Sequence, residues 1–246
     1  GLFLFEGQGW EKALVGNWRS RNGGVLLGVQ HTVIRAFDTR AYQDPRIFSW
    51  SAVREDLLPD KLICNGLSAL NRLLAGGWPK DRLRSGEALR YDYLIGRRDI
   101  YLTELNNKTH VTLLLLGETD LRSSERMLEI FRDSIECGLR YTGIKVLVKF
   151  HPDCQIPFSI IEKLNLSDYC TLTKDPLIDL LKVSDIVFCG NSTTSSVEAL
   201  WLGIPTVIMR IPSQINLNPM FGVGEVRFVN SGEELKLSLD SPLSSN

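Results

Sequence analysis

The stretch IVFCGNSTTSSVEALWLGIPTVIMR, residues Ile186–Arg210, decides the fold class of this chain. Its two apolar runs, Ile186–Cys189 and Thr206–Met209, have the length and composition of strands that are buried on both faces of a sheet. The segment between them carries helix signals and ends at Gly203, which is typical of a helix C-terminus. Two strands joined by a helix form a βαβ unit, and ligands of such sheets bind at the carboxyl ends of the strands.

Small polar residues occupy that carboxyl end. They are Asn191, Ser192, Thr193, Thr194 and Ser195. Hydroxyls and backbone N–H groups at the start of a helix suit a phosphate group. The alternative interpretation is a helix cap at Thr194 or Ser195, with Glu198 as its capping partner, beside a solvated turn. Because one hydroxyl is enough for a cap, four in a row favour a ligand site.

Strands and helices alternate along the rest of the chain. Residues 101–246 alternate about five times, which predicts a parallel sheet with helices on both faces. Residues 1–100 carry three or four short strands with helices between them, and we expect the C-terminal part of a second Rossmann-like domain. The predicted fold class is therefore α/β, with two Rossmann-like domains of which the first is incomplete. A chain of 246 residues is long enough for both domains.

Composition excludes several classes of protein. The net charge of −1 provides no field that would attract nucleic acid, and the absence of a GxGxxG pattern argues against a nicotinamide cofactor. The three histidines are not paired at metal-ligand spacing, so we expect neither a metal nor a bound cofactor. The five cysteines are widely spaced, which predicts a reducing, cytoplasmic environment with Cys64 and Cys189 as core residues.

Two segments of the first half have a predicted structure that bears on the site. A helix is expected over Trp10–Trp18, with Trp10, Ala13, Leu14 and Trp18 (or Val15) on one face. Residues 35–58 are rich in Arg, Asp and aromatic residues and predict an ordered loop held by ion pairs. Such a loop is either a solvated surface or part of a binding site.

Polar side chains follow strands in both halves. Glu6 and His31 end successive predicted strands of the first half, and parallel strands would place both at one edge of the sheet. His151-Pro152 ends the strand predicted over Ile144–Phe150, and proline restrains the backbone of His151. Lys149 lies two residues before His151, so it is expected on the same face. We expect the His-Pro pair and the Ser/Thr cluster to lie on neighbouring strands and to bind a nucleotide phosphate together.

Three short motifs occur in an order that resembles the two-domain, Rossmann-like (GT-B) glycosyltransferases of bacterial surface polysaccharides. They are Glu6-Gly7, His151-Pro152 and Ser192-Thr193-Thr194-Ser195. Acidic-Gly, His-Pro and Ser/Thr motifs are also those of the bacterial sialyl-, polysialyl- and Kdo-transferases, which use CMP-activated sugars. Stretches such as FEGQGWEK, QHTVIR, FDTRAYQDPR and GEALRYDYL are similar to surface carbohydrate biosynthesis proteins of this kind. The resemblance covers nearly the whole chain, but only the later part of the first domain.

The resemblance implies a metal-independent transfer of a sugar from a nucleotide donor, with a CMP-sugar favoured, to a glycan or lipid-linked glycan of O-antigen or capsule biosynthesis. It implies that Glu6 is the general base, that His151 and Ser192–Ser195 contact the donor phosphate, and that Glu198 meets ribose hydroxyls. In related proteins two acidic residues often precede the glycine, whereas here Phe5 precedes Glu6. Contact with the inner membrane stays open, because such acceptors are often lipid-linked.

The residues themselves support the same division of roles. Glycosyl transfer needs a base near the acceptor and charge stabilisation at the departing phosphate. A carboxylate with a pKa of about 4 works better as a base when burial raises that pKa. We expect Leu2–Phe5 and Trp10 to provide that burial for Glu6. His31 is the rival base, since its imidazole titrates near neutral pH without help.

Three other interpretations remain. A polyol-phosphate transferase resembling the CDP-glycerol glycerophosphotransferases would depend more on His31 than on Glu6. A non-catalytic nucleotide- or glycan-binding domain would bind without turnover. A UDP-sugar epimerase with the same two-domain fold is the least favoured, because the Gly-rich loop and acidic cluster expected of it are missing from the sequence.

Overall fold

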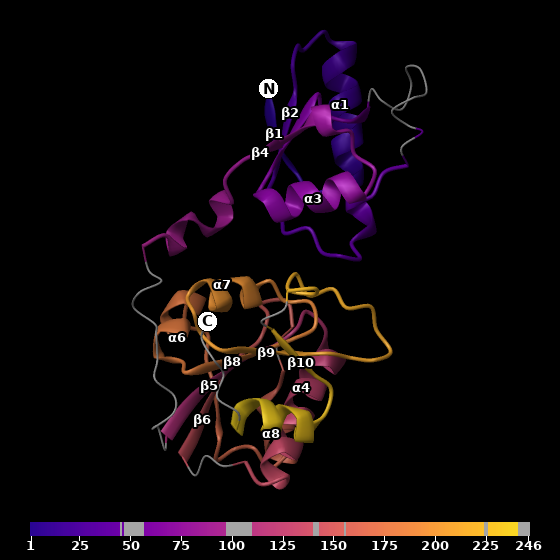
Figure 1. Ribbon diagram of the computed structural model, residues 1–246. Coiled ribbons are helices and arrows are strands. Elements are labelled where there is room, and N and C mark those ends of the chain that lie inside the picture. The colour runs from indigo at the N-terminus through magenta and orange to yellow at the C-terminus, as the bar shows by residue number, and fades with distance from the viewer. Residues whose placement is uncertain are drawn as a thin grey trace. The chain divides into compact units, whose positions relative to one another are not determined.

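A computed structural model describes residues 1–44, 46, 57–96, 110–139, 143–154, 156–223 and 226–240 (Figure 1). The chain divides into two compact units, Gly1–Tyr93 (unit 1) and Leu94–Asn246 (unit 2). The domain boundary predicted between residues 100 and 101 lies outside the described residues. No helix among the described residues is long and apolar enough to cross a membrane.

Unit 1 is built on a four-stranded parallel sheet in the order β1-β2-β3-β4. Its elements are β1 (Leu2–Phe5), α1 (Gly9–Ser20), β2 (Leu27–Gln30), the 3₁₀ turn η1 (Thr39–Ala41), β3 (Lys61–Cys64), α3 (Leu67–Ala75), η3 (Lys80–Arg82), β4 (Leu83–Ser85) and η4 (Leu89–Leu94), which runs into unit 2. Sequential strands are neighbours, so all four carboxyl ends meet at one edge.

The core of unit 1 forms where α3 packs against the sheet. It gathers Leu62 and Cys64 from β3, Leu73 from α3, and Trp78 from the turn that follows, all 3% exposed or less. Trp78 donates from its indole Nε1 to the carbonyl of Ala41 at 3.0 Å, so the segment after η1 is fixed to the core. A buried aromatic residue, Trp78, therefore anchors the segment around η1.

Unit 2 carries a six-stranded parallel sheet in the order β10-β9-β8-β5-β6-β7. Its elements are β5 (His110–Leu116), α4 (Leu121–Glu136), β6 (Gly143–Lys149), α5 (Phe158–Lys163), β7 (Cys170–Leu172), α6 (Leu177–Val183), β8 (Ile186–Cys189), α7 (Ser195–Trp201), β9 (Thr206–Met209), β10 (Arg227–Val229) and α8 (Gly232–Asp240). Beginning at β5, the chain builds outward to β7 and then returns to add β8 beside β5. The point between β5 and β8 is thus the topological switch point, where ligands of doubly wound sheets bind.

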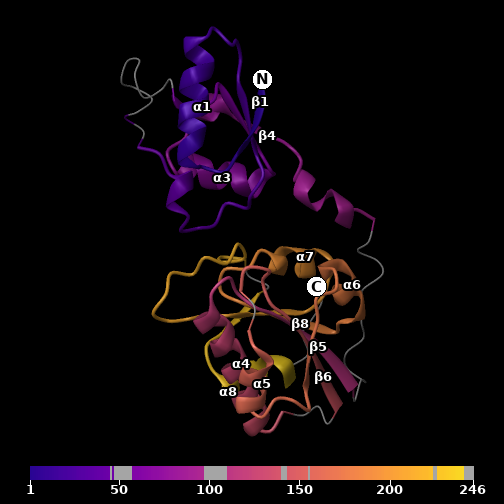
Figure 2. The ribbon, with the colours of Figure 1, turned by 180° about the vertical axis from the view of Figure 1, so that it is seen from behind.

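Both faces of this sheet are covered by helices, as Figures 1 and 2 show from opposite sides. On one face, Phe131 of α4, Ile161 of α5 and Leu235 of α8 pack against side chains such as Leu113 and Phe188. The alternate residues of the same strands are buried on the other face, toward α6 and α7. Burial on both faces explains why these strands read as unbroken apolar runs.

The fold class predicted from the sequence is confirmed: two parallel α/β sheets, each flanked by helices, make up the chain. The predicted apolar face of the first helix is wrong at Trp10 and right at Val15, which was the alternative to Trp18. Trp10 is 58% exposed, and the buried positions of α1 are Glu11 and Val15. Glu11 turns inward because its carboxylate accepts hydrogen bonds from the N–H groups of Glu6 and Gly7 at 2.7 and 3.0 Å.

The capping box predicted at the start of α7 is also wrong. Thr194 stands at the N-cap with φ −82° and ψ −11°, and its side chain makes no capping hydrogen bond. The Oγ1 of Thr193 accepts from the N–H of Ser195 at 3.4 Å instead. A cap side chain needs an extended backbone to reach forward, and a helical backbone at Thr194 prevents it.

Candidate functional site

The centre of the candidate site in unit 2 is a contact between the ends of β5 and β8. Glu118 follows β5 and is only 2% exposed. Its Oε1 accepts from the N–H of Ser192 at 2.7 Å, and its Oε2 accepts from the Ser192 hydroxyl. Ser192 is one of the predicted phosphate contacts, so both of its donors are engaged by a protein carboxylate in this structure.

Local packing holds Glu118 in place. The N–H of Glu118 donates to the hydroxyl of Ser124 at 2.9 Å, so the first turn of α4 supports the loop. A Cβ on Gly190 would lie 2.2 Å from Oε1 of Glu118, so only glycine fits there without displacing the carboxylate. The pKa of the Cys189 thiol lies well above its usual range, because the thiol is fully buried and faces the charges of Glu118 and Glu198.

A buried amide organises the loop that follows β8. Asn218 is fully buried, and its Nδ2 donates to the carbonyls of Gly190 and Thr193 at 3.2 and 3.4 Å. Its Oδ1 accepts from the hydroxyl of Ser196 at 3.2 Å and from the N–H of Met220 at 3.0 Å. The amide of Asn218 thus donates two hydrogen bonds and accepts two, all within the protein, and these four contacts hold the loop in its conformation.

The predicted nucleotide contacts in this loop lie at different depths. Asn191 is 4% exposed and donates from Nδ2 to the carbonyl of Ile215 at 3.1 Å. Thr193, Thr194 and Ser195 are half-buried at the surface of the loop, and Glu198 is half-buried on α7. Asn191 and Ser192 are thus hydrogen-bonded to distant parts of the chain, while Thr193–Ser195 are partly exposed.

His151 and Pro152 follow β6. The Nδ1 of His151 accepts from the N–H of Asp153 at 3.2 Å, and Asp153 Oδ2 lies 3.5 Å from the same nitrogen. An accepting Nδ1 places the proton of the neutral imidazole on Nε2, which is then a donor. The side chain of His151 is 41% exposed.

One expectation about His151 is corrected by the structure. The Ser/Thr cluster is not on a neighbouring strand, because β5 lies between β6 and β8. Glu118, at the end of β5, therefore stands between His151 and Ser192 along the edge. The Nζ of Lys149 donates to the carbonyl of Asp175 at 2.9 Å, and its contact with a phosphate stays a prediction.

The candidate site of unit 1 lies at the carboxyl ends of β1 and β2. These strands pair in parallel with Phe5 opposite Gln30, so Glu6 and His31 leave the sheet at the same edge, as predicted. Both are half-buried. Trp10 does not bury Glu6, because its side chain points to solvent.

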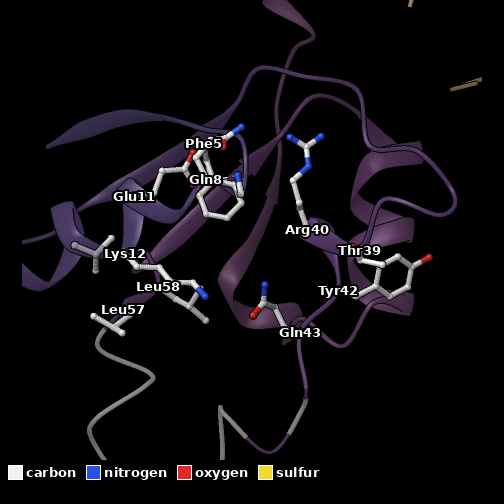
Figure 3. Close-up of a pocket in the computed structure, with 12 residues that line it drawn as sticks. Phe5, Gln8, Glu11, Lys12, Thr39, Arg40, Tyr42, Gln43, Leu57 and Leu58 are labelled. Carbon is white, nitrogen blue, oxygen red and sulfur yellow. Dashed lines mark hydrogen bonds between the residues drawn. The ribbon is translucent and has the colours of Figure 1, made fainter. Parts of the chain in front are cut away.

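A cavity of about 190 Å³ opens beside Gly7, between the start of α1 and the segment after η1 (Figure 3). Gly7 has φ +74°, and a Cβ there would lie 2.9 Å from Cβ of Arg40. Arg40 binds Asp38 through two hydrogen bonds of 2.9 and 2.7 Å, which confirms the ion pairing predicted for this loop. Residues 45 and 47–56 of the loop lie outside the described residues.

Three buried polar residues of these sites were not identified from the sequence, because no periodicity or motif marks them. Glu118 lies in a short loop, Glu11 lies within a helix, and Asn218 lies in an irregular segment. Each is polar and more than nine-tenths buried. Among the described residues no group of three or more His, Cys, Asp or Glu side chains is placed to hold a metal ion, and the expectation of no metal stays a prediction.

Two successive Rossmann-like units are the components of the GT-B fold, and comparison with solved structures agrees with this fold. No protein-family model matches the sequence, and no curated protein matches it. The UDP-GlcNAc 2-epimerase of Methanocaldococcus jannaschii, solved with UDP-GlcNAc and UDP, is similar over 99% of this chain and 70% of its own, with 17% identity and a TM-score of 0.59.

Two further solved structures share the fold. Staphylococcus aureus MnaA, solved with UDP, is similar over 91% of this chain and 61% of its own, with 15% identity and a TM-score of 0.58. Anabaena Alr3699/HepE, solved with UDP and glucose, is similar over 93% of this chain with 11% identity and a TM-score of 0.52. The chain spans 64% of the length of HepE. Identities this low show the fold alone.

Proposed function

We propose that this chain belongs to a carbohydrate enzyme that uses a nucleotide-sugar, and that the nucleotide binds at the carboxyl ends of β5, β6 and β8 in unit 2. The observation that carries the proposal is that partly exposed polar residues follow strands at this edge: Thr193, Thr194 and Ser195 follow β8 at the switch point, and His151 follows β6, which is the next strand beyond β5. The three solved neighbours support it, since each was solved with UDP or a UDP-sugar.

Within this class we propose glycosyl transfer to a glycan or lipid-linked glycan acceptor of surface polysaccharide biosynthesis. The order of the Glu6-Gly7, His151-Pro152 and Ser192–Ser195 motifs supports transfer, because it resembles transferases that use CMP-sugars. The neighbours support a UDP-sugar. Both donors carry a pyrimidine nucleotide, so a pyrimidine nucleotide-sugar is the donor class that we propose, with CMP and UDP as separate arms of the test.

The proposed chemistry assigns one task to each unit. Glu6, with His31 as the rival, removes the proton of the acceptor hydroxyl, and the oxygen then attacks the anomeric carbon of the donor. The Nε2–H of His151 and the hydroxyls of Thr193–Ser195 donate to the phosphate oxygens as negative charge develops on the leaving nucleotide. The reaction forms one glycosidic bond and breaks the sugar–phosphate bond.

Thermal unfolding with CMP, CDP, UMP, UDP and GDP tests the donor site. A ligand at a hundred times its Kd stabilises the folded state by about 2.7 kcal/mol, which corresponds to a rise of a few degrees in Tm. We expect a rise with a pyrimidine nucleotide that is lost in His151→Ala and kept in His110→Ala. His110 is a matched control, because it lies at the opposite end of β5. No rise with any nucleotide would overturn the proposal.

A UDP-sugar epimerase is the second candidate, and the observation that favours it is the similarity to the Methanocaldococcus enzyme over nearly the whole chain. Incubation of UDP-GlcNAc in D₂O without an acceptor separates the two reactions. Deuterium at C2 of the sugar would support epimerisation and contradict transfer. Release of UDP or CMP that requires a glycan acceptor would support transfer. Nucleotide binding with neither reaction would identify a non-catalytic domain.

A further inference from the structure

We propose that Glu118 determines the charge selectivity of the donor site: its carboxylate occupies an anion position at Ser192 and keeps a second phosphate group of a nucleotide out of that position. The inference rests on the proposed function in naming a nucleotide as the ligand. The anion position itself follows from the contacts between Glu118 and Ser192.

The contact between the two residues uses the hydrogen bonds that a phosphate group would use. The N–H and the hydroxyl of Ser192 both donate to one carboxylate, with 2.7 Å between the backbone nitrogen and Oε1 of Glu118. A phosphate group also presents more than one acceptor oxygen, and charge-assisted hydrogen bonds of this kind bind either anion. The Glu118 carboxylate therefore takes the place of a phosphate at Ser192.

The backbone around this carboxylate leaves room for it and encloses it. A Cβ added to Gly190 would clash with the Cγ, Cδ and Oε1 atoms of Glu118, so a side chain at Gly190 would displace the carboxylate. The N–H of Glu118 donates to the Ser124 hydroxyl at 2.9 Å, which holds the start of its loop. Because Glu118 is only 2% exposed, a ligand phosphate could take its place only by breaking both hydrogen bonds to Ser192.

The loop that carries the two donors of Ser192 is also held by a residue other than Glu118. Asn218 donates to the carbonyls of Gly190 and Thr193, which lie on either side of Ser192 in the chain, at 3.2 and 3.4 Å. Removal of the Glu118 carboxylate should therefore leave the loop in its conformation. The anion position would then be open to a ligand.

The charge of Glu118 explains the expected selectivity. Thr193–Ser195, the phosphate contacts of the proposed donor site, follow Ser192 directly in the sequence, so a phosphate group bound there is a near neighbour of the Glu118 carboxylate. Like charges at short distance repel each other more strongly where burial reduces screening by solvent. A nucleoside diphosphate carries more negative charge than a monophosphate and needs further donors, so it should lose more affinity.

Isothermal titration calorimetry at constant ionic strength tests the inference, with UMP, UDP, CMP, CDP and inorganic phosphate as probes. Glu118→Gln removes the charge and keeps the size of the side chain, whereas Glu118→Ala also vacates the position. For each base, the ratio of the diphosphate Kd to the monophosphate Kd should fall about tenfold in Glu118→Gln and further in Glu118→Ala. Glu162→Gln, at an exposed glutamate of α5, should leave the ratio unchanged.

Inorganic phosphate provides a second readout, which a purely structural role of Glu118 would not change. Glu118→Ala should bind phosphate about tenfold more tightly than the wild type, and the addition of Ser192→Ala should abolish this gain. An unchanged Kd ratio in both Glu118 variants, or no gain of phosphate affinity in Glu118→Ala, would overturn the inference.

Failure of the inference is distinguishable from failure of the proposed function. If the wild type bound no nucleotide, the proposed function would be contradicted, and the phosphate titrations would still decide whether Glu118 occupies an anion position. Nucleotide binding with the same Kd ratio in wild type and in both Glu118 variants would contradict the inference alone.

Discussion

The carboxylate of Glu118, at the end of β5, accepts two hydrogen bonds from Ser192, at the end of β8. The contact bridges the two central strands at the switch point, between residues 74 positions apart in the sequence. Two donors that a phosphate would use are thereby bound to an acidic side chain. A phosphate at Ser192 requires Glu118 to move, so Thr193–Ser195 are the more accessible contacts.

A double-mutant cycle on Glu118 and Ser192 measures this contact. Glu118→Ala should lower the free energy of unfolding by about 1–3 kcal/mol, because it leaves the partly buried donors of Ser192 without their acceptor. Ser192→Ala in the same background should cost less than in the wild type, and the coupling should exceed about 0.5 kcal/mol. Urea unfolding of the four proteins gives the coupling. Glu162→Ala, an exposed glutamate of α5, is the control, and additive effects would contradict a direct contact.

Gly190→Ala should destabilise unit 2 by about 1–3 kcal/mol, because the added Cβ would lie 2.2 Å from Oε1 of Glu118. Combining it with Glu118→Ala removes the clash, so the double variant should be hardly less stable than Glu118→Ala alone. Thermal or urea unfolding provides the comparison. Gly9→Ala is the matched control, since a Cβ there meets nothing within 4 Å. Equal costs of Gly190→Ala in both backgrounds would show that the clash lies elsewhere.

Glu11→Ala should lower the stability of unit 1 by about 1–3 kcal/mol, because the N–H groups of Glu6 and Gly7 lose their shared acceptor. Glu11→Gln keeps one carbonyl acceptor at this position and should cost distinctly less. Hydrogen exchange of the Glu6 and Gly7 amides should quicken in Glu11→Ala. The exposed Glu87→Ala is the control, and unchanged exchange in Glu11→Ala would contradict the role of Glu11 in the turn.

The Asp38–Arg40 pair predicts a dependence of stability on pH. The hydrogen bonds from Arg40 hold the pKa of Asp38 below its usual range, although partial burial acts in the opposite direction. A carboxyl group with a lowered folded-state pKa stabilises the fold above its unfolded pKa of about 3.9, and this stabilisation is lost as the pH falls through the folded value. The stability difference between wild type and Asp38→Asn should therefore be constant from about pH 5 to 8 and shrink below about pH 4.

Urea unfolding across this pH range measures the difference. Asp44→Asn is the contrasting variant, because Arg46 lowers the pKa of Asp44 to about 2 in an exposed pair that solvent screens. It should show no measurable pH-dependent difference. If the difference in unfolding free energy between wild type and Asp38→Asn persisted to pH 2, the charge-based explanation would be contradicted.

The five thiols should differ in reactivity toward iodoacetamide. Cys137 is exposed, whereas Cys64, Cys154, Cys170 and Cys189 are buried. Burial raises the pKa of Cys64 to about 11 and that of Cys170 to about 12, so little thiolate forms near neutral pH. Mass spectrometry after brief treatment of the native protein at pH 7.5 should find one label, on Cys137, and five after unfolding. Rapid labelling of Cys189 in the native protein would contradict its burial.

Sequence patterns identified the central strands of unit 2 because each of these is a short apolar run. Ile186–Cys189 and Thr206–Met209 were predicted with the bounds that the structure has. The order of the strands within the sheet was not accessible in the same way. β5 separates β6 from β8, and this arrangement depends on how the helices pack rather than on any local pattern. The placement of His151 relative to Ser192 was wrong for this reason.

The residues missed by the sequence patterns are buried and polar. Periodicity identifies apolar residues that face a core, so it favoured Trp10 for the inner side of α1 and passed over Glu11. Glu11 and Glu118 are buried because they bind backbone N–H groups of a neighbouring turn or strand end. Such partners come close only in the folded chain, and no spacing in the sequence reports them.

Asn218 also joins the segment that follows β9 to the end of β8. Its amide binds the carbonyls of Gly190 and Thr193 and the N–H of Met220, so two irregular segments share one set of hydrogen bonds. A single buried asparagine thus holds together two loops that no strand pairing connects.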